Sequence, residues 1–202
     1  MEKIIVATGN QDKMREIREI LAGFDIPILS MKEADLVTEV EETGETFEEN
    51  ALIKARAVWQ KSGNLVISDD SGLEIDALNK EPGIHSSRYL GEKTSYHIKN
   101  QILVDRLEGV PKEQRTARFV CAAAIIFPDG SEKTVRGVME GQIGYGEAGS
   151  NGFGYDPIFI LPKYGQTTAE LPPEIKNQES HRGQALRAVR DEIEAYRNRQ
   201  DS

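Results

Sequence analysis

The stretch IIVATGNQDKMREIREIL, residues 4–21, contains the pattern that decides the fold. Its first four residues are apolar and predict a short buried strand. Met14, Ile17 and Leu21 follow at spacings of three and four, which predicts one apolar face of a helix. A buried strand that leads through a polar turn into a helix is the opening unit of an α/β protein.

The same alternation continues along the chain. Thr46 and Glu49 match a capping box and predict a helix over residues 47–61. Residues 26–29 predict a second strand, and residues 65–68 predict a further buried strand. The polar run 69–72 would end that strand in a turn, before another strand at 73–77. Further helices are expected near 98–107 and 186–196, a hairpin over 117–140 that turns at 128–130, and a last strand at 158–161. We therefore expect an α/β protein with a mixed sheet, folded as a single domain over residues 1–202, with a smaller lobe around 110–145.

Composition excludes several classes of protein. The 202 residues carry 25 basic and 34 acidic side chains, a net charge of −9, which disfavours a nucleic-acid partner. No apolar run approaches the roughly 20 residues that a membrane span needs. The single cysteine, Cys121, excludes an internal disulfide. The first residues lack the pattern of a signal peptide, so we expect a cytoplasmic protein that contacts neither a membrane nor nucleic acid.

The first candidate site joins the first strand to the first helix. It consists of Thr8, Gly9, Asn10, Gln11, Asp12 and Lys13. The amides at a helix N-terminus suit a phosphate, and Gly9 would allow a close approach of the backbone to an anion. Asn10 is a helix cap by its type. A lysine in the first turn opposes the helix dipole, so it is better explained beside an anion. The alternative is an ordinary capped helix with a solvated lysine.

Two acidic segments form the second candidate. Asp69, Asp70 and Ser71 follow a buried strand, and ligands of α/β sheets bind beyond the carboxyl ends of strands. In extended chain the two aspartates point to opposite faces, so one of them would reach a site. Glu41 and Glu42 are carboxylates of the kind that Mg²⁺ prefers. The alternatives are a polar turn at 69–72 and a solvated acidic loop at 41–42.

Two segments near the C-terminus complete the candidates. Phe153 and Tyr155 stand among glycines, where they would be presented for stacking or would fill the core; Asp156 could accept hydrogen bonds from a base. His181 and Arg182 lie at the start of the last helix, with Lys176 upstream. They would meet a base carbonyl or a phosphate, or lie on the surface. Together, cations, hard carboxylates and aromatic rings fit a nucleoside phosphate with Mg²⁺.

Six segments occur in this order along the chain: TGNQDK (8–13), EETGETFEENALIKA (41–55), SDDSGL (68–73), PGIHSSRY (82–89), GFGYDPIF (152–159) and SHRGQAL (180–186). Over residues 3–197 the chain thereby resembles the inosine triphosphate pyrophosphatase family, the non-standard purine NTP pyrophosphatases. The resemblance implies an elongated α/β fold, with a long mixed sheet flanked by helices and two lobes with a cleft between them. It also implies a homodimer and the hydrolysis of ITP, dITP and XTP to the monophosphate and pyrophosphate.

The resemblance also implies roles for the site residues. Thr8 to Lys13 would hold the triphosphate, assisted by Ser71. Asp70 would be the catalytic acidic residue, and Asp70 and Glu41 would bind Mg²⁺, with Glu42 left open as the direct ligand instead. The base pocket would be lined by Phe153, Gly154, Tyr155, Asp156, Lys176, His181 and Arg182. A pyrophosphatase for another nucleotide, or a nucleotide sensor without catalysis, are the alternatives.

Overall fold

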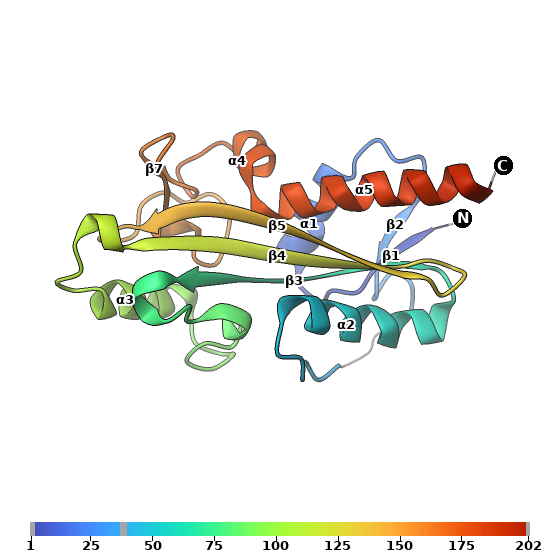
Figure 1. Ribbon diagram of the computed structural model, residues 1–202, viewed down its shortest axis with the longest axis horizontal. Coiled ribbons are helices and arrows are strands. Elements are labelled where there is room, and N and C mark those ends of the chain that lie inside the picture. Colours follow the sequence, from blue (N-terminus) through green and yellow to red (C-terminus); the bar gives the residue numbers. More distant parts are fainter. Residues whose placement is uncertain (1–2, 37–39, 201–202) are drawn as a thin grey trace. The chain divides into compact units, whose positions relative to one another are not determined.

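The computed structural model describes residues 3–36 and 40–200. Its strands form one sheet in the order β2-β1-β3-β4-β5-β6-β7 (Figure 1). β1 pairs in parallel with β2 and with β3, whereas β6 pairs antiparallel with β5 and with β7. The sheet is therefore mixed and helices flank it, which confirms the predicted fold class.

The strands are β1 (Ile4–Val6), β2 (Ile28–Ser30), β3 (Leu65–Ile75), β4 (Thr116–Ile126), β5 (Glu132–Ile143), β6 (Phe159–Leu161) and β7 (Gln166–Thr167). The α-helices are α1 (Gln11–Ile20), α2 (Phe47–Ser62), α3 (Tyr96–Arg106), α4 (Pro173–Glu179) and α5 (His181–Gln200). Short 3₁₀ helices cover Asp76–Leu78, Gly83–His85, Lys112–Gln114 and Asp156–Ile158.

Contacts within the chain divide it into two compact units. Unit 1 comprises the described residues of 1–70, 121–137 and 182–202, and unit 2 comprises residues 71–120 and 138–181. β3, β4 and β5 each contribute residues to both units. Each unit has its own apolar core.

The core of unit 1 follows from the two-residue period of its strands. Ile4 and Val6 of β1 belong to a cluster with apolar residues of α1 and α5. Ile5, the residue between them, belongs to a second cluster with Ala51 and Val58 of α2. Figure 1 shows α1 and α5 on one face of these strands and α2 on the other. The continuous apolar run at the N-terminus is thus explained by helices on both faces.

The core of unit 2 gathers around the second half of β3. Leu73 and Ile75 pack in one cluster with Leu103 of α3, Phe119 of β4 and Phe159 of β6. Phe119 and Phe159 contribute an aromatic pair, with ring centroids 4.5 Å apart. This cluster supports the segment that carries the glycines and aromatics of the sequence around residue 153.

The structure corrects one local prediction and adds two elements. β3 runs without interruption through residues 69–72, where the sequence predicted a turn between two strands. The polar residues remain in the strand because Asp69 and Asp70 find charged partners inside the protein. β7 and α4 were not predicted, since two residues and seven residues are too short to show a period.

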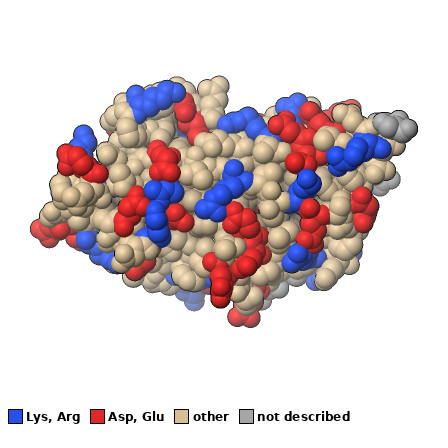
Figure 2. All heavy atoms as spheres, in the orientation of Figure 1, with Lys and Arg blue, Asp and Glu red and all other residues tan. Residues whose placement is uncertain are grey.

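The described surface is mixed in charge. Figure 2 shows acidic and basic side chains interspersed on the face that it draws. No helix in residues 3–36 and 40–200 is long and apolar enough to cross a membrane.

Candidate active site

The first turn of α1 is built as the sequence predicted. Asn10 is the N-cap, and its Oδ1 accepts hydrogen bonds from the amides of Asp12 and Lys13 at 2.9 and 3.1 Å. The amide of Asn10 donates in turn to Thr8 Oγ1. Gly9 is exposed, and a Cβ added there would meet no atom within 4 Å. The strand-to-helix junction therefore presents an open side, with Gln11 exposed beside it.

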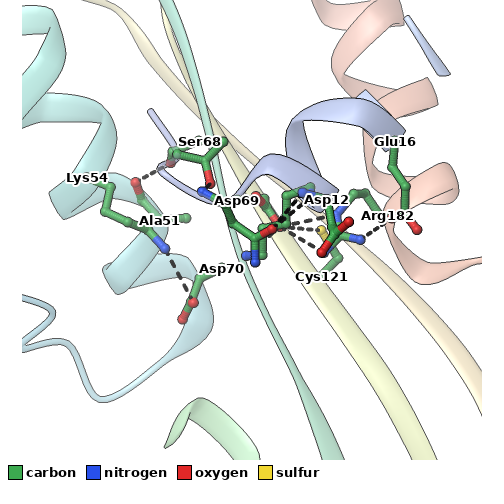
Figure 3. A network of polar contacts seen from close by, with 12 residues as sticks. Asp12, Glu16, Ala51, Lys54, Ser68, Asp69, Asp70, Cys121 and Arg182 are labelled. Atoms are coloured by element: carbon green, nitrogen blue, oxygen red, sulfur yellow. Dashed lines mark hydrogen bonds and ion pairs between the residues drawn. The ribbon is translucent and has the colours of Figure 1, made fainter. Parts of the chain in front are cut away.

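Lys13 faces the sheet rather than bulk water. Its Nζ lies 3.0 Å from Oδ2 of Asp69, and the lysine side chain is 16% exposed. Asp69 also pairs with Arg182 of α5 at 3.3 Å, and Arg182 pairs with Glu16 of α1 (Figure 3). Burial by itself would raise the pKa of Asp69, but the nearby Lys13, Arg182 and Lys54 outweigh burial and hold this pKa well below its usual range. Asp69 is thus an ionised anchor for two cations.

Asp70 points to the other side of β3 and meets α2. Nζ of Lys54 lies 3.4 Å from Asp70 Oδ1 and 2.7 Å from Glu42 Oε1. Burial raises the pKa of Asp70, Lys54 and Lys13 lower it, and Glu42 and Asp69 raise it; the net shift is upward. The other oxygen, Oδ2, is buried and has no hydrogen-bond partner among the described residues. The alternation predicted for the two aspartates is confirmed.

α2 and β3 are joined directly beside this pair. Ser68 Oγ donates a hydrogen bond to the carbonyl of Ala51, as Figure 3 shows. The contact holds α2 against β3, and Lys54, three residues after Ala51 in α2, lies beside Asp70. Ser71 follows Asp70 in the same strand and is half-buried.

The carboxylates of Asp70 and Glu42 suit a divalent cation. Asp70 Oδ2 is a buried oxygen without a partner among the described residues, which costs about 1–3 kcal/mol. The Lys54 ammonium already lies between the two carboxylates, so the site accommodates a positive charge. Mg²⁺ takes one or two protein carboxylates and completes its shell with water or phosphate. Among residues 3–36 and 40–200, no three His, Cys, Asp or Glu side chains are arranged to hold a metal by themselves. Glu41, the expected ligand, is exposed.

A second polar cluster lies in unit 2, around Asp156. Its Oδ2 lies 2.6 Å from Lys176 Nζ and accepts a hydrogen bond from the Phe153 amide at 2.9 Å. Oδ1 accepts a hydrogen bond from Thr168 Oγ1 at 2.7 Å. Asp156 and Lys176 are 3% and 4% exposed. A Cβ on Gly152, where φ is +72°, would lie 2.2 Å from Asp156 Oδ2. Asp156 therefore organises the loop around it.

The two aromatic residues of this loop differ. Phe153 is half-buried, with the Lys176 ammonium 5.2 Å from its ring centroid. Tyr155 is buried: its ring meets Tyr96 edge to face at 5.1 Å, and its hydroxyl donates to the carbonyl of Ser86 at 2.6 Å. Of the two alternatives, presentation for stacking fits Phe153, and filling of the core describes Tyr155.

α3 supports the loop from the side. Asn100 is 1% exposed, and its Nδ2 donates to Glu147 at 2.7 Å and to the carbonyl of Gly154 at 3.2 Å.

His181, in the same unit, stacks on Phe119 with centroids 4.9 Å apart and an interplanar angle of 12°. His181 is 6% exposed, so it is not the surface residue of the alternative.

Two residues that the sequence analysis does not single out, Lys54 and Asn100, have partners distant in the chain. Lys54 lies 16 residues from Asp70, and Asn100 lies 54 residues from Gly154. The signal available in the sequence is the spacing of two polar residues. Asn50 and Lys54 stand four residues apart in the segment EETGETFEENALIKA, so they share one face of the predicted helix. The sequence favours Asp70 over Asp69, whereas the structure gives Asp69 two cationic partners, Lys13 and Arg182.

A family model now places these residues among known proteins. The model of the Ham1 family matches residues 4–192 of the chain. The chain belongs to the Ham1 family. A relative from Exiguobacterium sibiricum, named dITP/XTP pyrophosphatase, is 48% identical over 187 residues, which cover 93% of this chain and 94% of the relative.

Solved structures of Ham1 proteins have the same fold. The Staphylococcus aureus Ham1 protein matches with a TM-score of 0.86 at 40% identity, over 96% of this chain and 100% of that one. A Coxiella burnetii HAM1 protein matches with a TM-score of 0.87, also at 40% identity, over 96% of this chain and 100% of that one. The family that the sequence resembled is therefore confirmed.

Proposed function

We propose that this Ham1-family chain hydrolyses dITP, XTP and ITP to the nucleoside monophosphate and pyrophosphate. The name of the relative from Exiguobacterium sibiricum supports the reaction and its substrates. The observation that carries the proposal is the juxtaposition on β3. Adjacent carboxylates there meet one lysine from α1 and another from α2, so a phosphate chain and a cation would find complementary charge within one unit.

The triphosphate would bind at the N-terminus of α1. The open side of the backbone at Gly9 admits an anion, and the helix dipole favours it there. Lys13, held in place by Asp69, would supply the neutralising charge. Because Arg182 also pairs with Asp69, we assign Arg182 the role of holding that carboxylate rather than of contacting the base.

Asp70 and Glu42 would hold Mg²⁺. We prefer Glu42 to the expected Glu41, because Glu42 shares the ammonium of Lys54 with Asp70 whereas Glu41 is exposed. When bound, Mg²⁺ offsets charge on the phosphates and makes water more acidic. A divalent cation would compete with Lys54 for the two carboxylates and leave its ammonium available to a phosphate oxygen.

Asp70 would direct the attacking water. Its buried Oδ2 is the atom we assign to hold that water and to accept its proton as the water attacks the α-phosphorus. Lys13 and Lys54 would offset the charge that develops on the phosphates, the type of interaction that supplies most of the acceleration in such reactions.

Base recognition would belong to unit 2. Hypoxanthine and xanthine have a keto oxygen where adenine has an amino group, so hydrogen-bond donors select them. Lys176 has three N–H donors and His181 carries a ring donor, and both are fixed, by Asp156 and by Phe119. An adenine amino group facing these donors would lose hydrogen bonds worth about 1–3 kcal/mol each.

We also propose that the protein forms a homodimer and that it is located in the cytoplasm.

The test is pyrophosphate release from ITP, XTP, GTP and ATP, each with and without Mg²⁺. We expect release from ITP and XTP only with the metal, and a kcat/KM for ATP at least about tenfold lower, as one lost hydrogen bond implies. GTP shares the 6-keto oxygen, so the slow turnover that we also expect for GTP has to come from separate rejection of its 2-amino group. Equal rates for ATP and ITP would contradict the assigned donors. Tight binding of ITP without release of pyrophosphate would contradict the hydrolysis itself.

A further inference from the structure

The segment that carries Glu42 is attached to α2 at three points. Glu42 itself pairs with Lys54. The amide of Gly44 donates to Asn50 Oδ1 at 2.8 Å, and the amide of Glu45 donates to Glu49 Oε2 at 2.7 Å. Two of these contacts involve backbone, so they determine where the chain runs immediately after Glu42.

Gly44 fits only because it has no side chain. A Cβ there would lie 2.7 Å from Asn50 Oδ1, 2.7 Å from Glu49 Cβ and 2.9 Å from the Asn50 amide nitrogen. Distances this short require the backbone to shift. The glycine and the asparagine therefore interlock, and neither can change without displacing the segment.

The Asn50 side chain is buried for this contact. Asn50 is 0% exposed, although it lies in the first turns of a helix. A backbone N–H can only donate, so its bond to Asn50 determines which amide atom faces Gly44 and directs Nδ2 elsewhere. Nδ2 is buried and has no hydrogen-bond partner in the described part of the chain. A buried donor without a partner costs free energy, so the bond from Gly44 is kept at the expense of the other end of the Asn50 amide.

We propose that Asn50 is a positioning residue that sets the affinity of the Asp70–Glu42 pair for Mg²⁺ by holding Gly44, and with it Glu42, against α2. The inference rests on the metal site of the proposed function. Residues that orient metal ligands typically change metal affinity 10–100-fold when they are removed. Asn50 and Lys54 lie on one face of α2, four residues apart, so the same face that positions Glu42 also carries its cationic partner.

The test follows the Gly44 amide and Mg²⁺ binding in the same samples by NMR, with no nucleotide present. In Asn50→Ala we expect faster hydrogen exchange at Gly44 and a Kd for Mg²⁺ raised at least about tenfold. Gln60→Ala, an exposed change on the same helix, is the matched control and should leave both unchanged. Unaltered Mg²⁺ affinity in Asn50→Ala, with exchange at Gly44 accelerated, would overturn the inference.

Two further variants separate positioning from general damage. Asn50→Asp keeps an oxygen that accepts from Gly44, so we expect slow exchange to return together with Mg²⁺ affinity. Asn50→Ala combined with Gly44→Ala should weaken Mg²⁺ binding no more than the stronger single change, because both act on one contact. Affinity that does not follow Gly44 protection across this series would argue against a positioning role.

Asp70→Asn distinguishes the two proposals. If Mg²⁺ binds the original chain with the same affinity as Asp70→Asn, the metal site is not at Asp70, and both the metal assignment of the proposed function and the role of Asn50 fail, while pyrophosphate release tests the hydrolysis separately. If Asp70→Asn weakens binding and Asn50→Ala does not, the metal site stands and only the role of Asn50 is lost.

Discussion

Asp69 and Asp70 are neighbours in β3, yet the pKa values of their carboxyl groups are shifted in opposite directions. Asp69 is enclosed by Lys13 and Arg182, and these cations keep its pKa low despite burial. Asp70 has one lysine at 3.4 Å and one buried oxygen without a partner in the described chain, and its pKa is raised. Alternation along a strand is thus sufficient to give two neighbouring carboxylates different partners and pKa shifts of opposite direction.

Asp70→Asn should lower kcat for ITP at least about 100-fold, because it removes a carboxylate that accepts a proton. The amide is nearly isosteric, so the melting temperature should change little. Steady-state kinetics at saturating Mg²⁺ measure the effect, with the exposed Asp105→Asn as the control. Near-full turnover in Asp70→Asn would remove Asp70 from the mechanism.

Arg182→Ala should destabilise the chain by about 3–5 kcal/mol, because it leaves Asp69 and Glu16 buried with less compensating charge. Arg190→Ala on the same helix is the matched control. Its pair with Glu194 is exposed on both sides, so the loss should stay below about 1 kcal/mol. Urea unfolding measures both; a similar small loss for the two variants would show that the buried pairs contribute little.

A few elements position most of the candidate site residues, because each of these elements has different side chains on its different sides. β3 crosses from the apolar core to the site without leaving extended geometry. α2 binds the Glu42 segment, holds Lys54 and receives the Ser68 hydroxyl. The loop around Phe153 depends instead on glycine, since Gly152 combines a positive φ with a close approach to Asp156.

Gly152→Ala tests that loop. A side chain at φ +72° costs about 1–3 kcal/mol, and the Cβ would also displace the Asp156 carboxylate. If the loop binds the base, a loss near 1.4 kcal/mol raises KM for ITP about tenfold while kcat changes less. Gly146→Ala in the same glycine-rich segment is the control, because a Cβ there meets nothing within 4 Å. Equal KM values in the two variants would place the base elsewhere.

At the scale of the described chain, paired aspartates predict acid lability: Asp69 is buried beside Lys13 and Arg182, and the half-buried Asp76 pairs with Arg118 at 3.0 Å. Asp69 and Asp76 have pKa values lowered from an ordinary 3.8, so their stabilisation is present above about pH 4 and is lost as pH falls below it. Asp70, with a raised pKa, contributes in the opposite sense. Glu33, Glu81, Asp129 and Glu132 also have lowered pKa values, so the lowered groups outnumber Asp70 and the free energy of unfolding should fall between pH 4 and pH 2. Urea titrations at several pH values measure it, and equal stability at pH 3 and pH 7 would contradict this assignment.

Periodicity and capping were sufficient to predict the α/β class, the helices α1, α2, α3 and α5, and the hairpin of β4 and β5. These features depend on residues two, three or four positions apart, so their spacing in the sequence is sufficient to predict them. The Asn10 cap was predicted for the same reason and is confirmed. The uninterrupted β3 was not, because local turn preference of Asp, Ser and Gly is weaker than ion pairs to residues that lie far away in the chain.

The pairings inside each unit could not be predicted from spacing. Lys54 reaches Asp70 across 16 residues, and Arg182 reaches Asp69 across 113. Whether Tyr155 or Phe153 is buried likewise depends on Tyr96 and Ser86, which pack against Tyr155 only after the chain folds. Residue types were therefore enough to suggest which chemistry is present, whereas burial and charge pairing, which exist only between distant segments, assign the role of each carboxylate and each cation.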